Sequence, residues 1–434
     1  MTFKKFFIAI FCLCLISSAI FIKVNDWKFY SLYFHQKYDL TQEYIEKKNI
    51  RSTQQLDEGK IIFEEDKFNY LKFPLKNFGV KYLDEDYIYR PLGYIDTYQD
   101  RIILISYNGE IFYSNKINEI KKNKLILKKF DVTGYDFNFD PEDDYYFRNI
   151  KIRDILIDND DLYITSNGSQ KVDEDNDFSE PQILKGKINL NDSLIKFKTF
   201  YSFDKKIYNI SDWSHTGGRL IKYKDSSLLL SMPDHAMMED LKKFTDMVSS
   251  KDTIFGKVLL IKDNESKTFS IGHRNPQGLF YDDKNDLIFE TEHGPTGGDE
   301  INLIKENNNY GWPISTYGAW IPGLNVSRFH KKNGFSEPLA YWWPANCAIS
   351  EITKVDSDFN KNWKGYTLIN ACLSGSQDQG ESLYRWKFDK KKEKLIKKAK
   401  YHIGDRIRDL KYHNKEKVLI MLIENQKSLV LIFE

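Results

Sequence analysis

One pattern recurs along the chain and constrains its fold more than any other feature. An apolar pair, a short turn rich in Asp, Lys and Asn, and a second alternating apolar run appear together six times. The copies read LGYIDTYQDRIILIS, IRDILIDNDDLYITS, GRLIKYKDSSLLLS, QGLFYDDKNDLIFETE, ISEITKVDSDFNKNWKGYTLINA and IRDLKYHNKEKVLIMLIE. Alternating apolar residues on both sides of such a turn are typical of a β-hairpin. The chain is therefore predicted to consist mainly of β-strands.

The spacing of the six hairpins predicts how these strands are organised. Successive copies lie about 50 to 80 residues apart, so each unit has room for two further strands. Six such units predict an all-β fold, a six-bladed β-propeller of four-stranded antiparallel blades over residues 86–434. A pair of β-sandwiches and an irregular β protein are the alternatives. After the N-terminus, the one fair helical candidate lies around Met237 to Ser249.

The N-terminal region differs from the repeats. Lys4 and Lys5 precede an apolar run from Phe6 to Ile22, which is typical of an export signal and is just long enough for a membrane anchor. Residues 1–22 are thus predicted to be a signal peptide or an N-terminal anchor. The mature chain would then be periplasmic or secreted, with an inner-membrane tether through residues 6–22 as the second option. Residues 23–85 are expected to form an irregular extension that supplies a closing outer strand.

Charge excludes one class of partner and suggests another. Lys and Arg total 64 against 63 Asp and Glu, and no basic stripe stands out, so no nucleic-acid partner is expected. Basic residues nevertheless recur at the start of the first strand of several hairpins. Because inner strands of a propeller begin around one mouth of the central channel, these residues predict a cationic pocket for an anionic ligand. Alternatively, each Arg pairs with a neighbouring carboxylate such as Asp154 or Asp409. The strands begin with Arg153-Asp154, His215-Thr-Gly-Gly-Arg219, Arg274-Asn-Pro-Gln277, Ser350-Glu351 and Arg406-Ile-Arg408-Asp409.

Two further features suggest chemistry at this mouth. His215 is followed by Gly217-Gly218, and cationic surroundings favour a neutral imidazole suited to a general base. A His that only satisfies a backbone carbonyl is the alternative. The turn HGPTGGDE, residues 293–300, offers carbonyl oxygens beside carboxylates, which predicts a Ca²⁺ site. Zinc is less expected, because His273 and His293 lack a third ligand at a recognisable spacing.

Several of these segments together resemble a known family. GHRNPQGL, ETEHGPTGGDEINLI and NNNYGWP, with SHTGGRL, GDRIRDL and, more loosely, EPLAYWWPANCAIS, are similar to the soluble pyrroloquinoline-quinone (PQQ) dehydrogenases of the glucose/sorbosone dehydrogenase family. The similarity covers about residues 86–434. It implies a six-bladed propeller that oxidises an aldose-type sugar or related alcohol and passes electrons to an acceptor that the sequence does not identify. The cofactors implied are PQQ and Ca²⁺.

The resemblance also implies roles for individual residues. His215 would be the base that takes the proton of the sugar hydroxyl as hydride passes to the quinone. The remaining roles concern the two cofactors. Arg274 and Asn275 would contact PQQ, Arg406 and Arg408 would pair with its carboxylates, and the carbonyls of Gly294 and Pro295 would hold the Ca²⁺ as a Lewis acid.

Departures from the family pattern keep other functions open. Leu373-Ser374-Gly375 stands where the family often has a Lys, Asn149-Ile150-Lys151 where it has Gln-Gly-Gly, and residues 232–235 read Met-Pro-Asp-His where it has a small Gly-containing stretch. A degenerate member that binds a carbohydrate or a protein without redox activity is therefore the alternative. A propeller hydrolase of the lactonase kind is the third hypothesis. It would need a central metal held by carboxylates from several blades.

Two cysteines lie outside the N-terminal apolar run. In the fifth hairpin, with its turn near residues 359–360, Cys347 and Cys372 fall opposite each other. This register predicts a structural disulfide, in keeping with an oxidising compartment. Two small buried hydrophobic side chains are the alternative.

Overall fold

The structure is a computed structural model of the chain. It describes residues 60–63, 66–75, 78, 93–106, 109–135, 152–171, 177–203, 207–208, 217–235, 241–318, 329–343, 345–376 and 379–434. The predicted signal or anchor, residues 1–22, and most of the extension to residue 85 lie outside these ranges. No helix among the described residues is long and apolar enough to span a bilayer.

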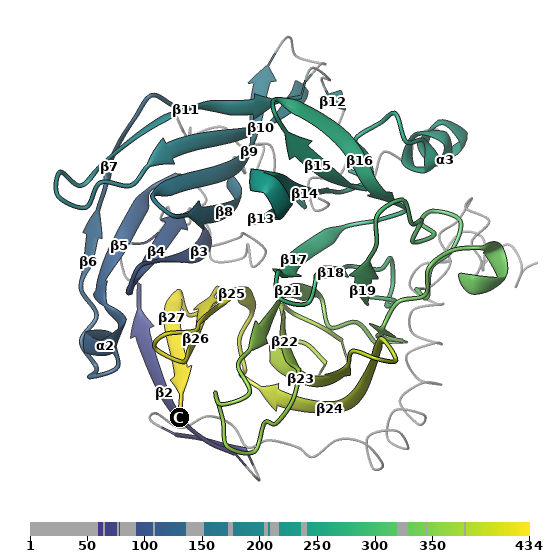
Figure 1. The fold of residues 1–434 in the computed structure, drawn as a ribbon. Helices are drawn as coiled ribbons and strands as arrows, with labels where there is room; N and C mark the ends of the chain where they lie inside the picture. Colours follow the sequence, from purple (N-terminus) through teal and green to yellow (C-terminus); the bar gives the residue numbers. More distant parts are fainter. Residues whose placement is uncertain are drawn as a thin grey trace, which may run out of the picture. The chain divides into compact units, whose positions relative to one another are not determined.

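The described strands form six sheets, each with a core of four antiparallel strands, which confirms the predicted propeller (Figure 1). From the innermost strand outward, the first blade is β3 (Gly93–Tyr98), β4 (Arg101–Ser106), β5 (Ile111–Lys116) and β6 (Leu127–Lys129). The second is β8 (Ile152–Asp158), β9 (Asp161–Lys171), β10 (Asp177–Lys187) and β11 (Leu194–Ser202), with β7 (Asp131–Thr133) and β12 (Ile207–Tyr208) added. The third is β13 (Leu220–Lys222), β14 (Leu228–Met232), β15 (Lys257–Lys262) and β16 (Glu265–Ile271).

The other three blades follow the same order. The fourth is β17 (Pro276–Asp282), β18 (Leu287–Glu292), β19 (Glu300–Ile304) and β20 (Ala340–Tyr341). The fifth is β21 (Ile349–Val355), β22 (Thr367–Cys372), β23 (Ser382–Asp389) and β24 (Lys394–His402). The sixth is β25 (Ile407–His413), β26 (Val418–Ile423), β27 (Ser428–Phe433) and β2 (Asp66–Pro74), with β1 (Lys60–Phe63) beyond β2. Two helices occur among the described residues, α2 (Ile117–Ile120) and α3 (Leu241–Ser249), beside the short 3₁₀ turns Lys224–Ser226 and Lys331–Asn333.

The six innermost strands close a ring. β3 contacts β8, β8 contacts β13, and the series continues through β17, β21 and β25 back to β3. The sixth blade takes its outer strand from the other end of the chain, because β2 pairs antiparallel with β27. This pairing ties residues 69–74 to residues 428–433 and removes an exposed sheet edge.

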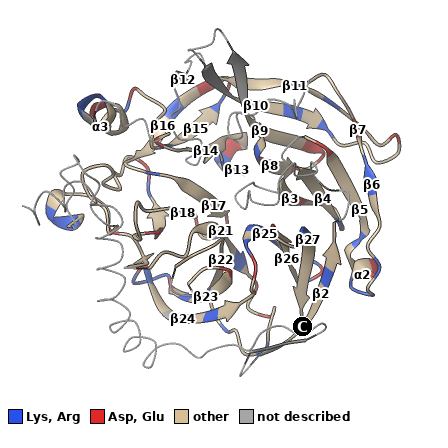
Figure 2. Ribbon diagram, turned by 180° about the vertical axis from the view of Figure 1, so that it is seen from behind, with Lys and Arg blue, Asp and Glu red and all other residues tan. Residues whose placement is uncertain are grey.

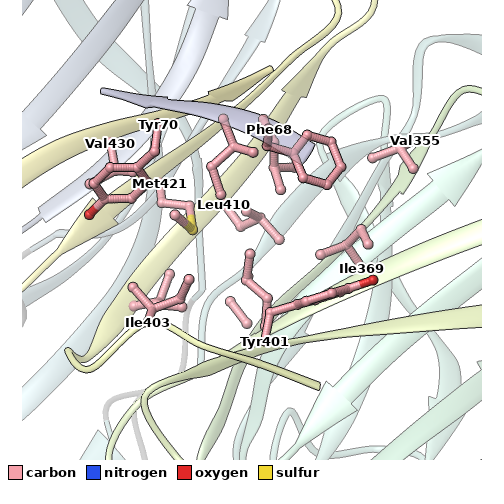
Figure 3. Close-up of a cluster of buried hydrophobic side chains, with 14 of the residues drawn as sticks. Phe68, Tyr70, Val355, Ile369, Tyr401, Ile403, Leu410, Met421 and Val430 are labelled. Atoms are coloured by element: carbon pink, nitrogen blue, oxygen red, sulfur yellow. The ribbon is translucent and has the colours of Figure 1, made fainter. Parts of the chain in front are cut away.

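Apolar side chains fill the spaces between neighbouring blades. Strands such as β26 and β27 are buried at every position, because both faces of a blade pack against its neighbours. Figure 3 shows one such layer, in which Phe68 and Tyr70 of β2 lie with Met421, Val355 and Ile369 from the fifth and sixth blades. These layers hold the inner strands, and therefore the side chains at their starts, in fixed positions.

The fifth hairpin contains the predicted disulfide, but in a different register. Cys347 and Cys372 are bonded, with their Cα atoms 5.4 Å apart. Cys372 pairs with Ile349 rather than with Cys347, because the ladder, in which Glu351 pairs with Ala371, centres the turn near residue 361. The bond therefore joins β22 to the segment two residues before β21.

Candidate functional site at the starts of the inner strands

Four of the described inner strands share an irregularity near their first residue. The register with the neighbouring strand shifts across one residue in β8, β17, β21 and β25. The skipped residues are Arg153, Gln277, Ser350 and Arg408. A β-bulge of this kind bends the strand and redirects side chain and carbonyl. A β-bulge thus shapes the same end of the central channel in four different blades.

Arg219, which directly precedes β13, joins these bulges at the centre of the ring. Its guanidinium donates hydrogen bonds to the carbonyls of the bulged residues Gln277, Ser350 (3.3 Å) and Arg408 (3.4 Å). Its carbon Cζ also lies 5.0 Å from the ring centroid of Tyr94 on β3. Arg219 therefore contacts the first, fourth, fifth and sixth blades from its place in the third.

The carboxylates that follow the bulges neutralise Arg219. Its Nη1 lies 2.9 Å from Asp154 Oδ1, 3.0 Å from Asp409 Oδ1 and 3.2 Å from Glu351 Oε2. Burial opposes the charge of Arg219, but the three carboxylates raise its pKa well above the usual value. We call Arg219, Asp154, Glu351 and Asp409 the axial network. For Arg219 the alternative of pairing with neighbouring acids is correct, and this residue is not available to an anionic ligand.

A second cation, Lys411 on β25, interacts with the axial network. It is half-buried, and although burial lowers its pKa, Asp409, Asp154 and other carboxylates raise it above the ordinary range. Burial raises the pKa of Glu351 to about 8, against the opposing effect of Arg219 and Lys411. Seen from the opposite side, the start of β25 is basic and charged segments lie at β13 (Figure 2). The ring is thus joined at its centre by charge as well as by apolar packing.

Arg406 and Arg408 have a different environment. Both are buried, and both bind one carboxylate: Arg406 Nε lies 2.7 Å from Glu424 Oε2, and Arg408 Nε lies 2.5 Å from Glu424 Oε1. Arg406 Nη1 also donates to Ser374 Oγ at 2.5 Å. Ser374, which stands where the resemblance implies a Lys, therefore accepts a bond from Arg406. The carboxylate of Glu424 therefore holds two guanidinium groups side by side.

Arg153 adds a further positive charge at this end of the ring. Its side chain is buried, and burial together with the nearby Arg408 lowers its pKa to about 10, although Tyr94 acts in the opposite direction. Gly218 lies directly against it, because a Cβ at this glycine would come within 2.6 Å of Arg153 Cβ. His215, the predicted base, lies outside the described residues, as do Asn149 to Lys151. The structure does place the Gly217-Gly218 turn that follows His215 beside Arg153.

Arg274 and Asn275 lie just before β17. Arg274 is half-buried, and its Nη1 donates to the carbonyls of His293 (3.0 Å) and Gly294 (2.8 Å). Asn275 is buried and accepts a hydrogen bond from Gln277 through Oδ1. The start of the fourth blade therefore contacts the predicted Ca²⁺ turn directly.

The turn that carries Gly294 and Pro295 joins β18 to β19 and is held by Asp299. The Asp299 carboxylate accepts bonds from the backbone N–H groups of Gly294, Cys347 and Ala348, and burial raises its pKa to about 6. The peptides of Gly294 and Pro295 stay half-exposed. The disulfide-bonded segment of the fifth blade is thus attached to the predicted Ca²⁺ turn.

Comparison with known proteins now assigns the family. A family model described as glucose / sorbosone dehydrogenase matches residues 148–431. The chain belongs to the glucose/sorbosone dehydrogenase family. Three curated proteins resemble it in part. The aldose sugar dehydrogenase YliI of Escherichia coli is 28% identical over 192 residues, which are 42% of this chain and 52% of the relative. The quinoprotein glucose dehydrogenase B of Acinetobacter calcoaceticus is 33% identical over 169 residues (33% of each chain), and the uncharacterized protein slr1608 of Synechocystis is 29% identical over 235 residues (50% of this chain and 55% of the relative).

The matched regions span about half of these relatives or less. Solved structures agree over more of the chain: the apo-form aldose sugar dehydrogenase of Escherichia coli gives a TM-score of 0.58 at 17% identity, covering 84% of this chain and 99% of that one. The PQQ-bound aldose sugar dehydrogenase of Streptomyces coelicolor gives 0.54 at 17%, covering 84% and 98%. At such identities the likeness establishes the shared propeller fold.

The sequence analysis did not identify the residues that hold this site in place through contacts with distant parts of the chain. Glu424, at the end of the hairpin β25–β26, was not expected to hold Arg406 and Arg408. Asp299 was considered only as a cation ligand, yet it binds three backbone N–H groups. One signal for the axial network was present, since Ile-Arg-Asp occurs at both 152–154 and 407–409, and Ile-Ser-Glu at 349–351.

Proposed function

We propose that this protein is a PQQ- and Ca²⁺-dependent dehydrogenase that oxidises an aldose-type sugar or a related alcohol. The family, the fold and the relatives named as sugar dehydrogenases support this assignment. The observation that carries it is the gathering of three buried guanidinium groups at the starts of β8 and β25, two of which bind the same carboxylate, Glu424. Such a set favours a ligand with several carboxylates.

The residues at the mouth fit PQQ, whose carboxylates are the matching groups. Arg406 and Arg408 bind Glu424 through their Nε atoms, so their charge is shared rather than cancelled. Burial is the main reason for the lowered pKa of Arg153, and repulsion from Arg408 adds to it. A bound polycarboxylate would relieve this repulsion. Arg274 and Asn275 would complete the contacts from the fourth blade.

The turn at Gly294 and Pro295 also fits a hard cation, with one condition. Carbonyl oxygens on a half-exposed turn are suitable Ca²⁺ ligands, and Asp299 fixes the turn from behind. Arg274 Nη1, however, lies 2.8 Å from the Gly294 carbonyl. For Ca²⁺ to bind that carbonyl, the guanidinium of Arg274 would have to turn away. A carboxylate of PQQ would then be the new partner of Arg274.

The chain's own residues would divide the remaining work. Bound PQQ would accept the hydride from the sugar carbon. His215 would take the proton of the sugar hydroxyl, and the positive charge of Arg153, Arg406 and Arg408 would keep its imidazole neutral beforehand. The close packing of Gly218 on Arg153 would hold the backbone after His215 next to the guanidinium set.

A cofactor titration tests the proposal. Purified protein with Ca²⁺ is titrated with PQQ, binding is followed by cofactor absorbance, and dye reduction is measured with a panel of sugars. We expect saturable binding at micromolar PQQ, and about a 10- to 100-fold weaker affinity in Arg408→Met, which loses one charge-assisted contact. Arg101→Met, in the first blade, is the matched control and should bind as the wild type does. Absence of saturable binding at micromolar PQQ would sink the proposal.

A binding propeller without redox activity is the second candidate. It is favoured by one observation, namely that Ser374 stands where the resemblance implies a Lys and binds Arg406 instead. A sugar that binds while PQQ does not would support it. The hydrolase hypothesis is disfavoured, because the axial carboxylates Asp154, Glu351 and Asp409 bind the guanidinium of Arg219.

We further propose that the protein works outside the cytoplasm, with residues 1–22 as its signal peptide or anchor. The basic start and the apolar run support this placement. Cell fractionation with an antibody, combined with the N-terminal sequence of the mature chain, distinguishes cleavage from retention. Recovery of the full chain in the cytoplasm would contradict the placement.

A further inference from the structure

A buried group of potential metal ligands lies in the fourth blade, apart from the Gly294 turn. His273 precedes β17, and Glu290 and Glu292 lie on β18. One ligand atom from each can be chosen so that all three lie within 4.8 Å of one another. His273 and Glu290 are 0% exposed and Glu292 is 4% exposed, so the group is shielded from water.

We propose that His273, Glu290 and Glu292 bind a divalent transition-metal ion, with Zn²⁺ or Mn²⁺ as the chemical class. This site is independent of the proposed dehydrogenase activity. It uses different atoms from the carbonyls of Gly294 and Pro295.

The orientation of His273 is the first argument. Its Nε2 lies 2.8 Å from Ser270 Oγ, and its ring stacks on Tyr310 with centroids 4.9 Å apart. The ring is therefore held from two sides. Nδ1, which is buried and has no hydrogen-bond partner, faces Glu292 Oε1 at 3.8 Å and Glu290 Oε2 at 4.0 Å.

These distances suit an ion better than a proton. Both are too long for an N–H···O hydrogen bond, which requires about 2.7 to 3.2 Å. Two ligands that each lie about 2.1 Å from a metal are roughly 3.4 to 4.2 Å apart, depending on the angle between them. When Nε2–H donates to Ser270, Nδ1 carries a lone pair toward two carboxylates. A cation between the three groups removes that repulsion, and a hydrogen-bonded second nitrogen is the usual arrangement of a ligating His.

Asn302 on β19 offers a fourth ligand. Its Nδ2 lies 3.1 Å from Glu290 Oε2 and 3.1 Å from Glu292 Oε1, while its buried Oδ1 has no hydrogen-bond partner. Rotation of the amide by a half turn exchanges these atoms and directs Oδ1 at the carboxylates. The side chain then supplies the oxygen that completes a four-ligand site.

The donor set determines the class of ion. One imidazole nitrogen, two carboxylates and an amide oxygen form a mixed N/O set that suits Zn²⁺ or Mn²⁺, whereas Ca²⁺ prefers oxygen ligands alone. Burial of every ligand indicates a closed, structural site. Glu292 Oε2 also accepts a hydrogen bond from the backbone N–H of Arg274 at 2.6 Å. An ion on Glu292 would therefore fix the start of β17.

Metal analysis without PQQ tests the inference, so its failure is distinct from failure of the dehydrogenase proposal. The full chain is purified without chelator and its metal content is measured by mass spectrometry. We expect about one equivalent of Zn²⁺ or Mn²⁺ per chain in the wild type and under a fifth of that in Glu290→Gln. Asp282→Asn, which alters another buried carboxylate of the same blade, should retain the metal.

Thermal unfolding gives an independent measure. After chelation and dialysis, a hundredfold excess of the metal over Kd should raise Tm by about 3 °C in the wild type. Glu290→Gln should show no such shift. Equal metal content and equal shifts in the two proteins would overturn the inference, as would a shift that needs Glu290 and occurs with Ca²⁺ but not with Zn²⁺ or Mn²⁺.

A third measurement applies if Glu290→Gln does not fold. X-ray absorption of the metal-loaded wild type should show a first shell of nitrogen and oxygen with one imidazole. A shell with sulfur, or one without imidazole, would contradict the assignment.

Discussion

Replacing Arg219 with methionine should leave three buried carboxylates without their shared cation. The side chain is 3% exposed, and its Nη1 lies within 3.2 Å of an oxygen of Asp154, Asp409 and Glu351. Methionine has a similar length, so it fills much of the space while removing the charge and every donor. The perturbation is therefore mainly electrostatic.

The expected magnitude follows from the burial of this network. Removing one partner of a buried ion pair costs about 3 to 5 kcal/mol, because the remaining charge stays desolvated. The compact unit runs from Ser52 to Glu434, and at about 2.1 cal/mol/K per residue its unfolding entropy is about 0.8 kcal/mol/K. A loss of about 4 kcal/mol then lowers Tm by about 5 °C. Because three carboxylates share the guanidinium, we expect a cost in the upper half of the range of about 3 to 5 kcal/mol.

Calorimetry and urea unfolding of the two proteins measure this loss. The matched control is Lys222→Met on β13, three residues after Arg219, which breaks a salt bridge of 2.6 Å to Asp158. That pair is partly exposed, with 49% and 24% of the two side chains accessible, so its loss should cost less than about 1 kcal/mol. Both variants lose an ion pair of similar length, so the difference between their free energies of unfolding measures the effect of burial.

The pH dependence provides the decisive signature. Without Arg219, the carboxyl pKa values of the folded variant rise, so its folded state takes up protons as pH falls. The deficit relative to the wild type should therefore be larger at pH 8 than at pH 5. The reasoning is refuted if Arg219→Met unfolds within 1 kcal/mol of Lys222→Met, or if its deficit does not change with pH.

Three further substitutions test other parts of the structure. His215→Ala should abolish sugar-dependent dye reduction while leaving PQQ affinity within about threefold, and persistent turnover would show that the base is wrongly assigned. Burial lowers the pKa of Lys257 to about 7, so the folded state disfavours the ammonium and the wild type loses stability as pH falls from about 10.5 to 7. Lys257 Nζ also donates to the carbonyls of Val248 and Phe255, which methionine would leave without a donor, so the slope is the test: the stability of Lys257→Met relative to the wild type should rise as pH falls from about 11 to 7. Replacing Cys347 and Cys372 together by Ala should lower the free energy of unfolding by about 3 kcal/mol, and mass spectrometry of protein from its native compartment should find both thiols oxidised.

The hairpins were predictable because alternation and turn residues are local signals. Each of the six predicted hairpins forms the first two strands of one blade. The register of the fifth hairpin was not predictable from a regular ladder. Glu351 pairs with Ala371, so the turn is centred near residue 361 rather than 359–360, and a bulge at Ser350 then shifts the pairing by one more residue.

The partners of the basic residues could not be read from the sequence. Arg219 and Arg408 both begin inner strands and look equivalent in the chain. Arg219 is neutralised by acids 65 and 190 residues away, whereas Arg408 shares one acid, Glu424, with Arg406. Only the closed ring brings these groups together. The equivalent positions of the basic residues in the repeated hairpins therefore predicted where the charges lie, but not which of them can bind an anionic ligand.

The proposed ligands around His273 were missed for a related reason. Zinc-site spacings describe ligands that are close in the chain. Here the second and third ligands lie on the adjacent strand, because Pro276 pairs with Glu292 in the β17–β18 ladder. The predicted hairpin already implied this pairing, so the signal was present in the strand register rather than in the spacing.

The bulge in β25 connects the scaffold with the candidate site through one residue. The carbonyl of Arg408 accepts a bond from Arg219 in the axial network, while its side chain binds Glu424 at the mouth. Loss of Arg219 should therefore affect both stability and anion binding, because the peptide of Arg408 would lose its contact with the centre of the ring. If PQQ affinity in folded Arg219→Met were unchanged while stability fell, the two roles of the bulge would be separable. If both fall, the network that closes the propeller also positions the guanidinium groups.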